Sequence, residues 1–178
     1  MLVNRKKRKD GSMERTGWEQ TWVRIMTTVL TVAMMVLIFC FSTEDAEHSD
    51  RTSGKISSEV VHVVHPDYDQ KPPQIQKVYF DDAQHIVRKT AHFTEYLLLG
   101  LLIRLCLESW FGRRKGMLPA AWGAGTIYAG TDELHQLMID GRSGQLTDVL
   151  IDSCGVLTGA LIASLILHRL LSKKRRQA

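Results

Sequence analysis

Residues 130–152, GTDELHQLMIDGRSGQLTDVLID, decide how the rest of the chain can fold. This short stretch gathers the polar side chains of Asp132, Glu133, His135, Gln136, Asp140, Arg142, Asp148 and Asp152. Apolar sequence flanks it on both sides, at 117–129 and 149–167. Ionisable groups at the edge of apolar helices are costly, so they indicate a functional site. The stretch therefore predicts a polar connection between two membrane helices.

Working outward, the chain of 178 residues contains four apolar blocks. Each block is long enough, or nearly so, to cross a hydrocarbon core of about 30 Å as a helix. We predict membrane spans at about 22–42, 91–108, 117–135 and 149–170. The second and third blocks carry charged residues, so they need packing against other helices. The predicted fold is an all-α membrane protein, a bundle of four transmembrane helices with an amphipathic outer loop.

Basic residues set the predicted topology. They gather before the first block, between the second and third, and after the fourth, as Arg5, Lys6, Lys7, Arg8, Lys9, Arg113, Arg114, Lys115, Lys173, Lys174, Arg175 and Arg176. The positive-inside rule places these regions in the cytoplasm, with both termini inside. We thus divide the chain into a basic N-terminal segment (1–21), a transmembrane domain (22–170) and a basic tail (171–178). The net charge of +4 then reflects topology and contact with membrane lipids, not nucleic-acid binding.

The long first outer loop has features of its own. Residues 57–64 carry an apolar face on a polar segment, which predicts an amphipathic helix on the bilayer or over the mouth of the bundle. Pro66 is expected to end this helix, and residues 71–73 to form a turn or linker. Residues 81–89 look like a lead-in to the second span, with Asp81 or Asp82 as the N-cap.

Helical spacing places the polar residues on inward faces. The second span carries Arg88, His92, Glu95 and Leu99 on one face. The third carries Gly125, Ala129, Asp132 and Gln136 on one face, and the fourth carries Asp148, Asp152, Gly155, Gly159 and Ala163. Small residues let helices approach closely, so the face with the aspartates should face the bundle. The topology brings all these polar groups to the outer membrane face. The candidate site comprises Arg88, His92, Glu95, Asp132, Glu133, His135, Gln136, Arg142, Asp148 and Asp152.

The same residues form a recognisable set of motifs. They are RKTAHFTEY at 88–96, DELHQ at 132–136, GR at 141–142 and D-x-x-x-D-x-x-G at 148–155. This set, in this order, resembles the VanZ-like family, over about residues 25–168. The resemblance implies a small multi-pass protein of the bacterial cell membrane. The named member of that family confers low-level teicoplanin resistance.

Three interpretations of the site remain open. In the first, Arg88 and Arg142 pair with the carboxylates in a buried network that fixes helix register. In the second, the two arginines and the helix N-termini bind an anionic or lipid-linked envelope compound, such as a cell-wall precursor or a lipoglycopeptide. The third is a membrane-embedded hydrolase or transferase, acid/base or metal-dependent, acting on a lipid-linked substrate.

The sequence favours the second interpretation over the third. No H-E-x-x-H or G-x-S-x-G motif is present. We therefore assign no metal and no cofactor, and we expect His92 and His135 to be hydrogen-bonded members of the cluster. Tyr96 is expected to pack or lie at an interface, and Tyr128 is an open candidate to donate to Asp132. His168 has no evident partner in the sequence.

Overall fold

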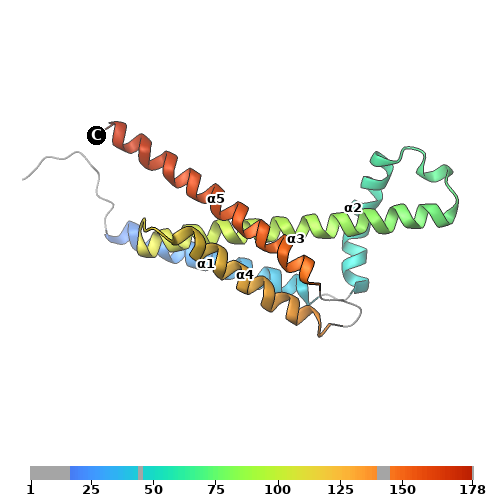
Figure 1. The fold of residues 1–178 in the computed structure, drawn as a ribbon, viewed down its shortest axis with the longest axis horizontal. Coiled ribbons are helices and arrows are strands. Elements are labelled where there is room, and N and C mark those ends of the chain that lie inside the picture. The colour runs from blue at the N-terminus through green and yellow to red at the C-terminus, as the bar shows by residue number, and fades with distance from the viewer. Residues whose placement is uncertain (1–16, 44–45, 140–144, 178) are drawn as a thin grey trace, which may run out of the picture.

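The computed structural model describes residues 17–43, 46–139 and 145–177, and within these ranges the protein is all-α (Figure 1). Its elements are α1 (Gly17–Ser42), α2 (Ala46–Val64), the short 3₁₀ helix η1 (Tyr68–Gln70), α3 (Pro73–Phe111), α4 (Met117–Gln136) and α5 (Leu146–Gln177). Helices α1, α4, α5 and the second half of α3 form a bundle. Helix α2, η1 and residues 73–90 of α3 extend from one end of it, and we call this part the arm.

Helix α3 begins earlier than the sequence predicts. Neither Asp81 nor Asp82 caps it, because the helix starts at Pro73 and runs for 39 residues. Proline fits the first turn of a helix, where its missing N–H has no intrahelical partner. At 1.5 Å per residue, α3 is about 58 Å long, roughly twice the thickness of a hydrocarbon core. Half of α3 can therefore lie in the bundle while the other half forms the spine of the arm.

The predicted amphipathic helix is present as α2, and it begins well before residue 57. It crosses the outer half of α3 (Figure 1). Its side chains Ser57 and Val61 are buried against α3, together with Ala83. Beyond the end of α2, the ring of His65 stacks on that of Tyr79 at 4.0 Å between centroids. These contacts explain why the polar residues before the second span are helical: α2 covers one side of them.

Helix α5 packs against α3 through the small residues that the sequence placed on one face. A Cβ atom added at Gly155 would lie 2.6 Å from the carbonyl oxygen of Phe93, and one at Gly159 would overlap the carbonyl oxygen of Leu97. Ala163, one turn further along, is fully buried. The two backbones are therefore in direct contact, which confirms the predicted inward face of α5.

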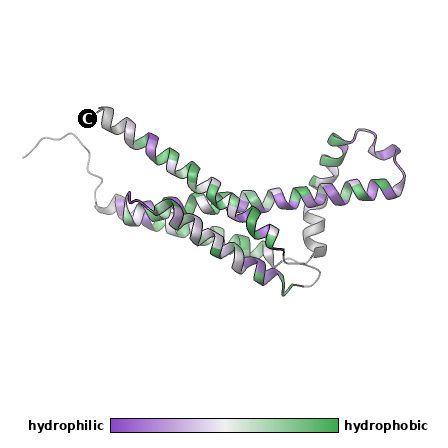
Figure 2. Ribbon diagram, in the orientation of Figure 1, coloured by the Kyte–Doolittle hydropathy of each residue, from purple (hydrophilic) through white to green (hydrophobic). Residues whose placement is uncertain are grey.

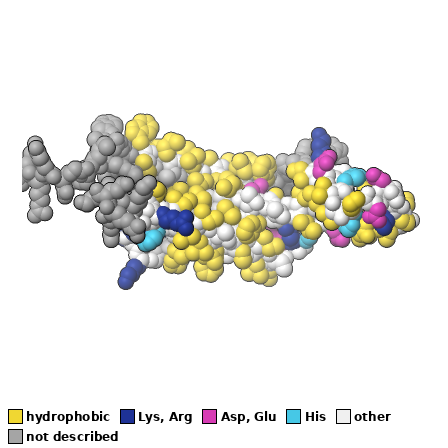
Figure 3. Space-filling view, turned by 90° about the horizontal axis from the view of Figure 1, so that it is seen from above, with side chains coloured by type: hydrophobic (Ala, Val, Ile, Leu, Met, Phe, Trp, Pro, Cys, Tyr) yellow, Lys and Arg dark blue, Asp and Glu magenta, His cyan; other side chains and the backbone are white. Residues whose placement is uncertain are grey.

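Among the described residues, three helices are long and apolar enough to cross a membrane: Gln20–Ser42 of α1, Pro73–Phe111 of α3 and Leu146–Leu170 of α5. Many of their apolar side chains face outward, such as Val29 of α1 at 56% exposed and Leu165 of α5 at 59%. An exposed apolar surface of this extent marks contact with a membrane. Figure 3 shows it as a yellow band over the bundle, with charged side chains gathered mainly on the arm. In Figure 2, hydrophilic and hydrophobic residues alternate along the outer half of α3.

The third predicted span is helical, but α4 does not match the other three. It covers Met117–Gln136, close to the predicted 117–135. It is not among the helices that meet the length and hydropathy of a membrane span. Four of its last five residues, DELHQ, are charged or strongly polar, and much of the rest is Gly, Ala and Thr, which are only weakly apolar. The count of four spans is thus not established by the helices themselves.

Three segments that adjoin the basic regions of the sequence lie at one end of the bundle. Figure 1 shows the first turn of α1, the connection between α3 and α4 and the last turn of α5 at the same end of the bundle. That connection is tight, and Gly112 and Gly116 take positive φ values of 67° and 96° that favour glycine. Near it, Arg113 lies 3.0 Å from Nδ1 of His168, which gives His168 a partner that the sequence did not reveal.

One charged pair lies within the bundle itself. Arg104 of α3 is 6% exposed and forms a salt bridge of 2.9 Å with Glu108, one turn later. Its Nε also donates to the hydroxyl of Ser164 on α5 at 3.1 Å. A buried charge needs a hydrogen-bonded partner, so these contacts explain how Arg104 is tolerated in an otherwise apolar helix.

Candidate functional site

Asp132 lies at the centre of the polar cluster, at the end of the bundle from which the arm extends. It is 4% exposed. Its Oδ2 accepts hydrogen bonds from the hydroxyl of Tyr96 on α3 at 3.1 Å and from the side-chain amide of Gln136, one turn along α4, at 3.3 Å. The same amide donates to the hydroxyl of Ser42, at the end of α1, at 3.2 Å. One carboxylate therefore joins α1, α3 and α4 at a single depth.

Asp152 brings α5 into the same cluster. It is 2% exposed, and the carboxylates of Asp132, Asp148, Glu133 and Glu95 lie near enough to act on its charge. Within the described residues, Oδ1 of Asp132 and Oδ1 of Asp152 are both buried without a hydrogen-bond partner. An unsatisfied buried polar group costs about 1–3 kcal/mol. A network that served packing alone would be expected to satisfy these atoms.

The edge of the cluster is held by different contacts. Lys89 of α3 forms an ion pair with Asp148 in the first turn of α5. Glu133 of α4 accepts a hydrogen bond from the backbone N–H of Gln145, just before α5 begins. Both contacts tie the connection between α4 and α5 to the helices around it. The sequence selected Arg88 and Arg142 as the cations of the site, and the structure adds Lys89, next to Arg88, which pairs with Asp148.

Helix α3 supplies a half-buried face to the cluster. Arg88, His92 and Glu95 are all partly exposed, and their spacing of four and three residues puts them on one side of the helix, as predicted. On α4, the ring of His135 stacks on Phe39 of α1, with the centroids 4.6 Å apart and 25° between the planes. These side chains remain more accessible than Asp132 and Asp152, so a ligand would meet them first.

The structure describes nine of the ten predicted site residues, and Arg142 lies outside the described residues. Asp132, Glu133, Gln136 and Asp152 are buried. In the described part of the chain, no three His, Cys, Asp or Glu side chains are arranged to hold a metal ion.

The structure adds three residues to the cluster that the sequence did not assign to the site. Tyr96 was expected to pack or lie at an interface, and it is fully buried and also donates to Asp132. Ser42 and Lys89 are the other two. Tyr96 and Lys89 belong to the motif at 88–96, which was the available signal. Tyr128 does not donate to Asp132, because its hydroxyl donates to the carbonyl oxygen of Met35 at 2.6 Å.

The fold and the site together define an α-helical, multi-pass membrane protein with a polar cluster at one end of its bundle. A family model described as VanZ/LLP1 matches residues 27–167. This match covers most of the chain, so the protein belongs to the VanZ/LLP1 family, as the motifs indicated. All ten predicted site residues lie within the matched range. No curated protein and no solved structure matches the chain.

Proposed function

We propose that this VanZ-family protein binds a lipid-linked cell-envelope compound or a lipoglycopeptide at the polar cluster, and that it thereby gives low-level resistance to teicoplanin. The observation that carries the proposal is the convergence of α1, α3, α4 and α5 on Asp132 and Asp152, at the end that the charge pattern places outside. Cell-wall precursors and lipoglycopeptides present their polar groups at this depth of the membrane.

The accessible edge of the cluster carries hydrogen-bond donors that can bind anions and acceptors that can bind amines or hydroxyls. Arg88, Lys89 and His92 on α3 can donate to a carboxylate or a phosphate, and the N-terminus of α5 adds a partial positive charge. Glu95 and Asp148 can accept hydrogen bonds from amines or hydroxyls. Lipid-linked wall precursors and glycopeptides carry all of these groups, so the residue set matches a polyfunctional ligand better than a simple anion.

The proposal includes the finer topology. Helix α4 would also cross the membrane, which gives four spans, because Asp132, Glu133 and Gln136 near its polar end are buried and bonded to neighbouring groups. The three basic regions would then lie in the cytoplasm, with both termini, and the cluster would face the outside of a bacterial cell membrane. A cysteine-accessibility scan of residues 113–115 and of the arm tests this arrangement.

Drug susceptibility tests the function. The wild type and three variants, Glu95→Gln, Glu59→Gln and Arg142→Ala, are expressed in a teicoplanin-susceptible host at matched membrane levels, and susceptibility to teicoplanin and vancomycin is measured. Glu95→Gln changes the half-buried face of the cluster without changing side-chain size. Glu59→Gln makes the same change on the exposed surface of α2 and is the matched control.

We expect the wild type and Glu59→Gln to protect against teicoplanin, and Glu95→Gln to lose that protection at equal abundance. Arg142→Ala is expected to lose it as well. If well-inserted wild type gives no protection, the link to teicoplanin is refuted for this chain. If Glu95→Gln protects as well as the wild type, the cluster does not meet the ligand.

A further inference from the structure

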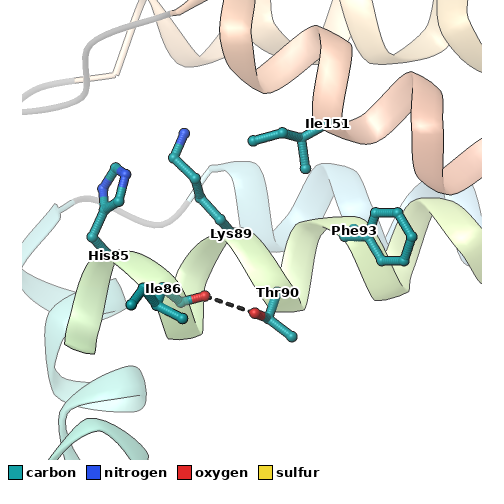
Figure 4. A pocket seen from close by; sticks show the side chains of 6 residues that line it. All are labelled: His85, Ile86, Lys89, Thr90, Phe93 and Ile151. Carbon is teal, nitrogen blue, oxygen red and sulfur yellow. Dashed lines mark hydrogen bonds between the residues drawn. The ribbon is translucent and has the colours of Figure 1, made fainter. Parts of the chain in front are cut away.

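A groove of about 280 Å³ opens on the side of the bundle, where α3 meets the start of α5 (Figure 4). Five of its six lining residues lie along one stretch of α3, and the sixth, Ile151, lies on α5. The lining residues are His85, Ile86, Lys89, Thr90, Phe93 and Ile151. In Figure 4, the side chains of His85 and Lys89 rise side by side from α3 toward α5.

The groove changes from polar to apolar along α3. His85 and Lys89 lie at its outer part, and Phe93, with Ile151 across from it, lies deeper along the bundle. From His85 to Phe93 the helix rises by about 12 Å. The polarity of a membrane lipid falls in the same direction, from its headgroup to its first methylene groups.

The position of the groove between two apolar helices indicates which kind of molecule fills it. Both walls belong to helices long and apolar enough to span a membrane. Beside it, Ile86 on α3 and Leu150 on α5 are 62% and 66% exposed, so the groove opens on an apolar outer surface. In a bilayer, that surface is covered by lipid. The polar end of the groove lies at the start of α5, where the helix leaves the apolar region.

The polar end can bind a phosphate group. An ammonium has three N–H donors, and the contact of Lys89 with Asp148 uses one of them. The side chains of Lys89 and Asp148 are 24% and 30% exposed, so both can be reached from the groove. The first turn of α5, with its partial positive charge, lies beside them.

We propose that this groove binds one membrane phospholipid, with the phosphate at Lys89 and His85 and the upper acyl chain against Phe93 and Ile151. Asp148 offsets the charge of Lys89, so this ion pair adds little net charge to the groove. We therefore expect phosphatidylglycerol and phosphatidylethanolamine to bind about equally well, because they share the phosphate. Diacylglycerol, which lacks it, should bind at least about fivefold more weakly. Lys89 and Asp148 also belong to the edge of the polar cluster, so lipid binding is tested with variants of groove residues outside that cluster.

Two threonines of α3 provide a matched pair of variants. Thr90 and Thr94 are both exposed, and each donates its hydroxyl to the carbonyl oxygen four residues earlier at 2.8 Å. Only Thr90 lines the groove. Thr90→Phe therefore fills the groove, whereas Thr94→Phe adds the same ring one turn away. Ile151→Trp fills the groove from the opposite wall and is a second test if Thr90→Phe folds poorly.

Native mass spectrometry of the full-length protein, released from mixed-lipid vesicles, measures the bound lipid. We expect the wild type and Thr94→Phe to retain one phospholipid, and Thr90→Phe and Ile151→Trp to retain it at least about fivefold less often. Equal retention in all four proteins, or no retained lipid in the wild type, overturns the proposal. Equal loss in Thr90→Phe and Thr94→Phe also overturns it, because the lipid would then adhere to the helix surface in general. Equal binding of diacylglycerol overturns the role of the phosphate.

Discussion

Replacing Gly159 with alanine should separate α3 from α5. The added Cβ would overlap the carbonyl oxygen of Leu97, which belongs to the backbone and cannot rotate away as a side chain would. Overpacking a tight contact costs about 1–3 kcal/mol. Alanine favours a helix over glycine by about 0.5–1 kcal/mol, which offsets part of this cost. We therefore expect Gly159→Ala to destabilise the folded protein by about 1–2 kcal/mol.

Gly130→Ala is the matched control. Gly130 lies within α4, and a Cβ atom there would meet nothing within 4 Å, so only the gain in helix propensity applies. Denaturant unfolding in mixed micelles, followed by circular dichroism, measures both variants against the wild type. Gly159→Ala should unfold at a lower denaturant concentration, and Gly130→Ala at the same concentration or a slightly higher one. Equal stability of the two variants would refute close backbone packing between α3 and α5.

Two further predictions concern the cluster and the arm. Tyr96→Phe removes the hydroxyl that donates to Asp132, which leaves a buried acceptor less satisfied and should lower the free energy of unfolding by about 1–2 kcal/mol in the same assay. On the arm, the carbonyl of Ser58 and then the carboxylate of Asp69 raise the pKa of His62 above its ordinary value of 6.5. These contacts stabilise the arm fully below the ordinary pKa and less as the pH rises through the raised value, so proteolysis of residues 65–72 should be slower near pH 5 than near pH 8.

Each of these predictions has a control. Tyr128→Phe removes a hydroxyl that bonds to the backbone of α1 and not to Asp132. The loss of stability caused by Asp132→Asn should therefore be the same with and without Tyr128→Phe. It should be smaller when Tyr96→Phe is present, and additive losses for Tyr96→Phe and Asp132→Asn would contradict the hydrogen bond between them. For His62, an NMR titration of the ring gives the pKa directly. Asp69→Asn should shift it toward 6.5, and no shift would show that the contact is absent in solution.

The inward faces of the helices could be predicted from the sequence because helical spacing alone defines them. Asp152, Gly155 and Gly159 recur every three or four residues, and no other arrangement would bury a carboxylate beside small residues. The structure places all three inside the bundle. Helical spacing also predicted the inward face of α4, on which Asp132 and Gln136 are both buried.

The start of α3 could not be predicted in the same way. The polar residues 81–89 resemble a helix N-terminus when they are considered alone. Their helical state depends on α2, which packs on Ala83 from more than twenty residues away in sequence. The partner of Asp148 was missed for a related reason. Spacing puts Arg88 and Lys89 on neighbouring faces of one helix, and the crossing of α5 over α3 decides which of them it meets.

The polar cluster divides into two parts that should respond differently to substitution. Ser42, Tyr96, Asp132 and Gln136 are buried and bonded to one another, so they hold α1, α3 and α4 in register. Arg88, His92, Glu95, His135 and Asp148 form the half-buried edge. A ligand from outside reaches the edge first, because the buried part has almost no exposed surface. Substitutions in the buried part should therefore lower the amount of folded protein, whereas Glu95→Gln should remove protection while abundance is kept. That separation, and not the loss of phenotype alone, distinguishes a binding site from an internal ion-pair network.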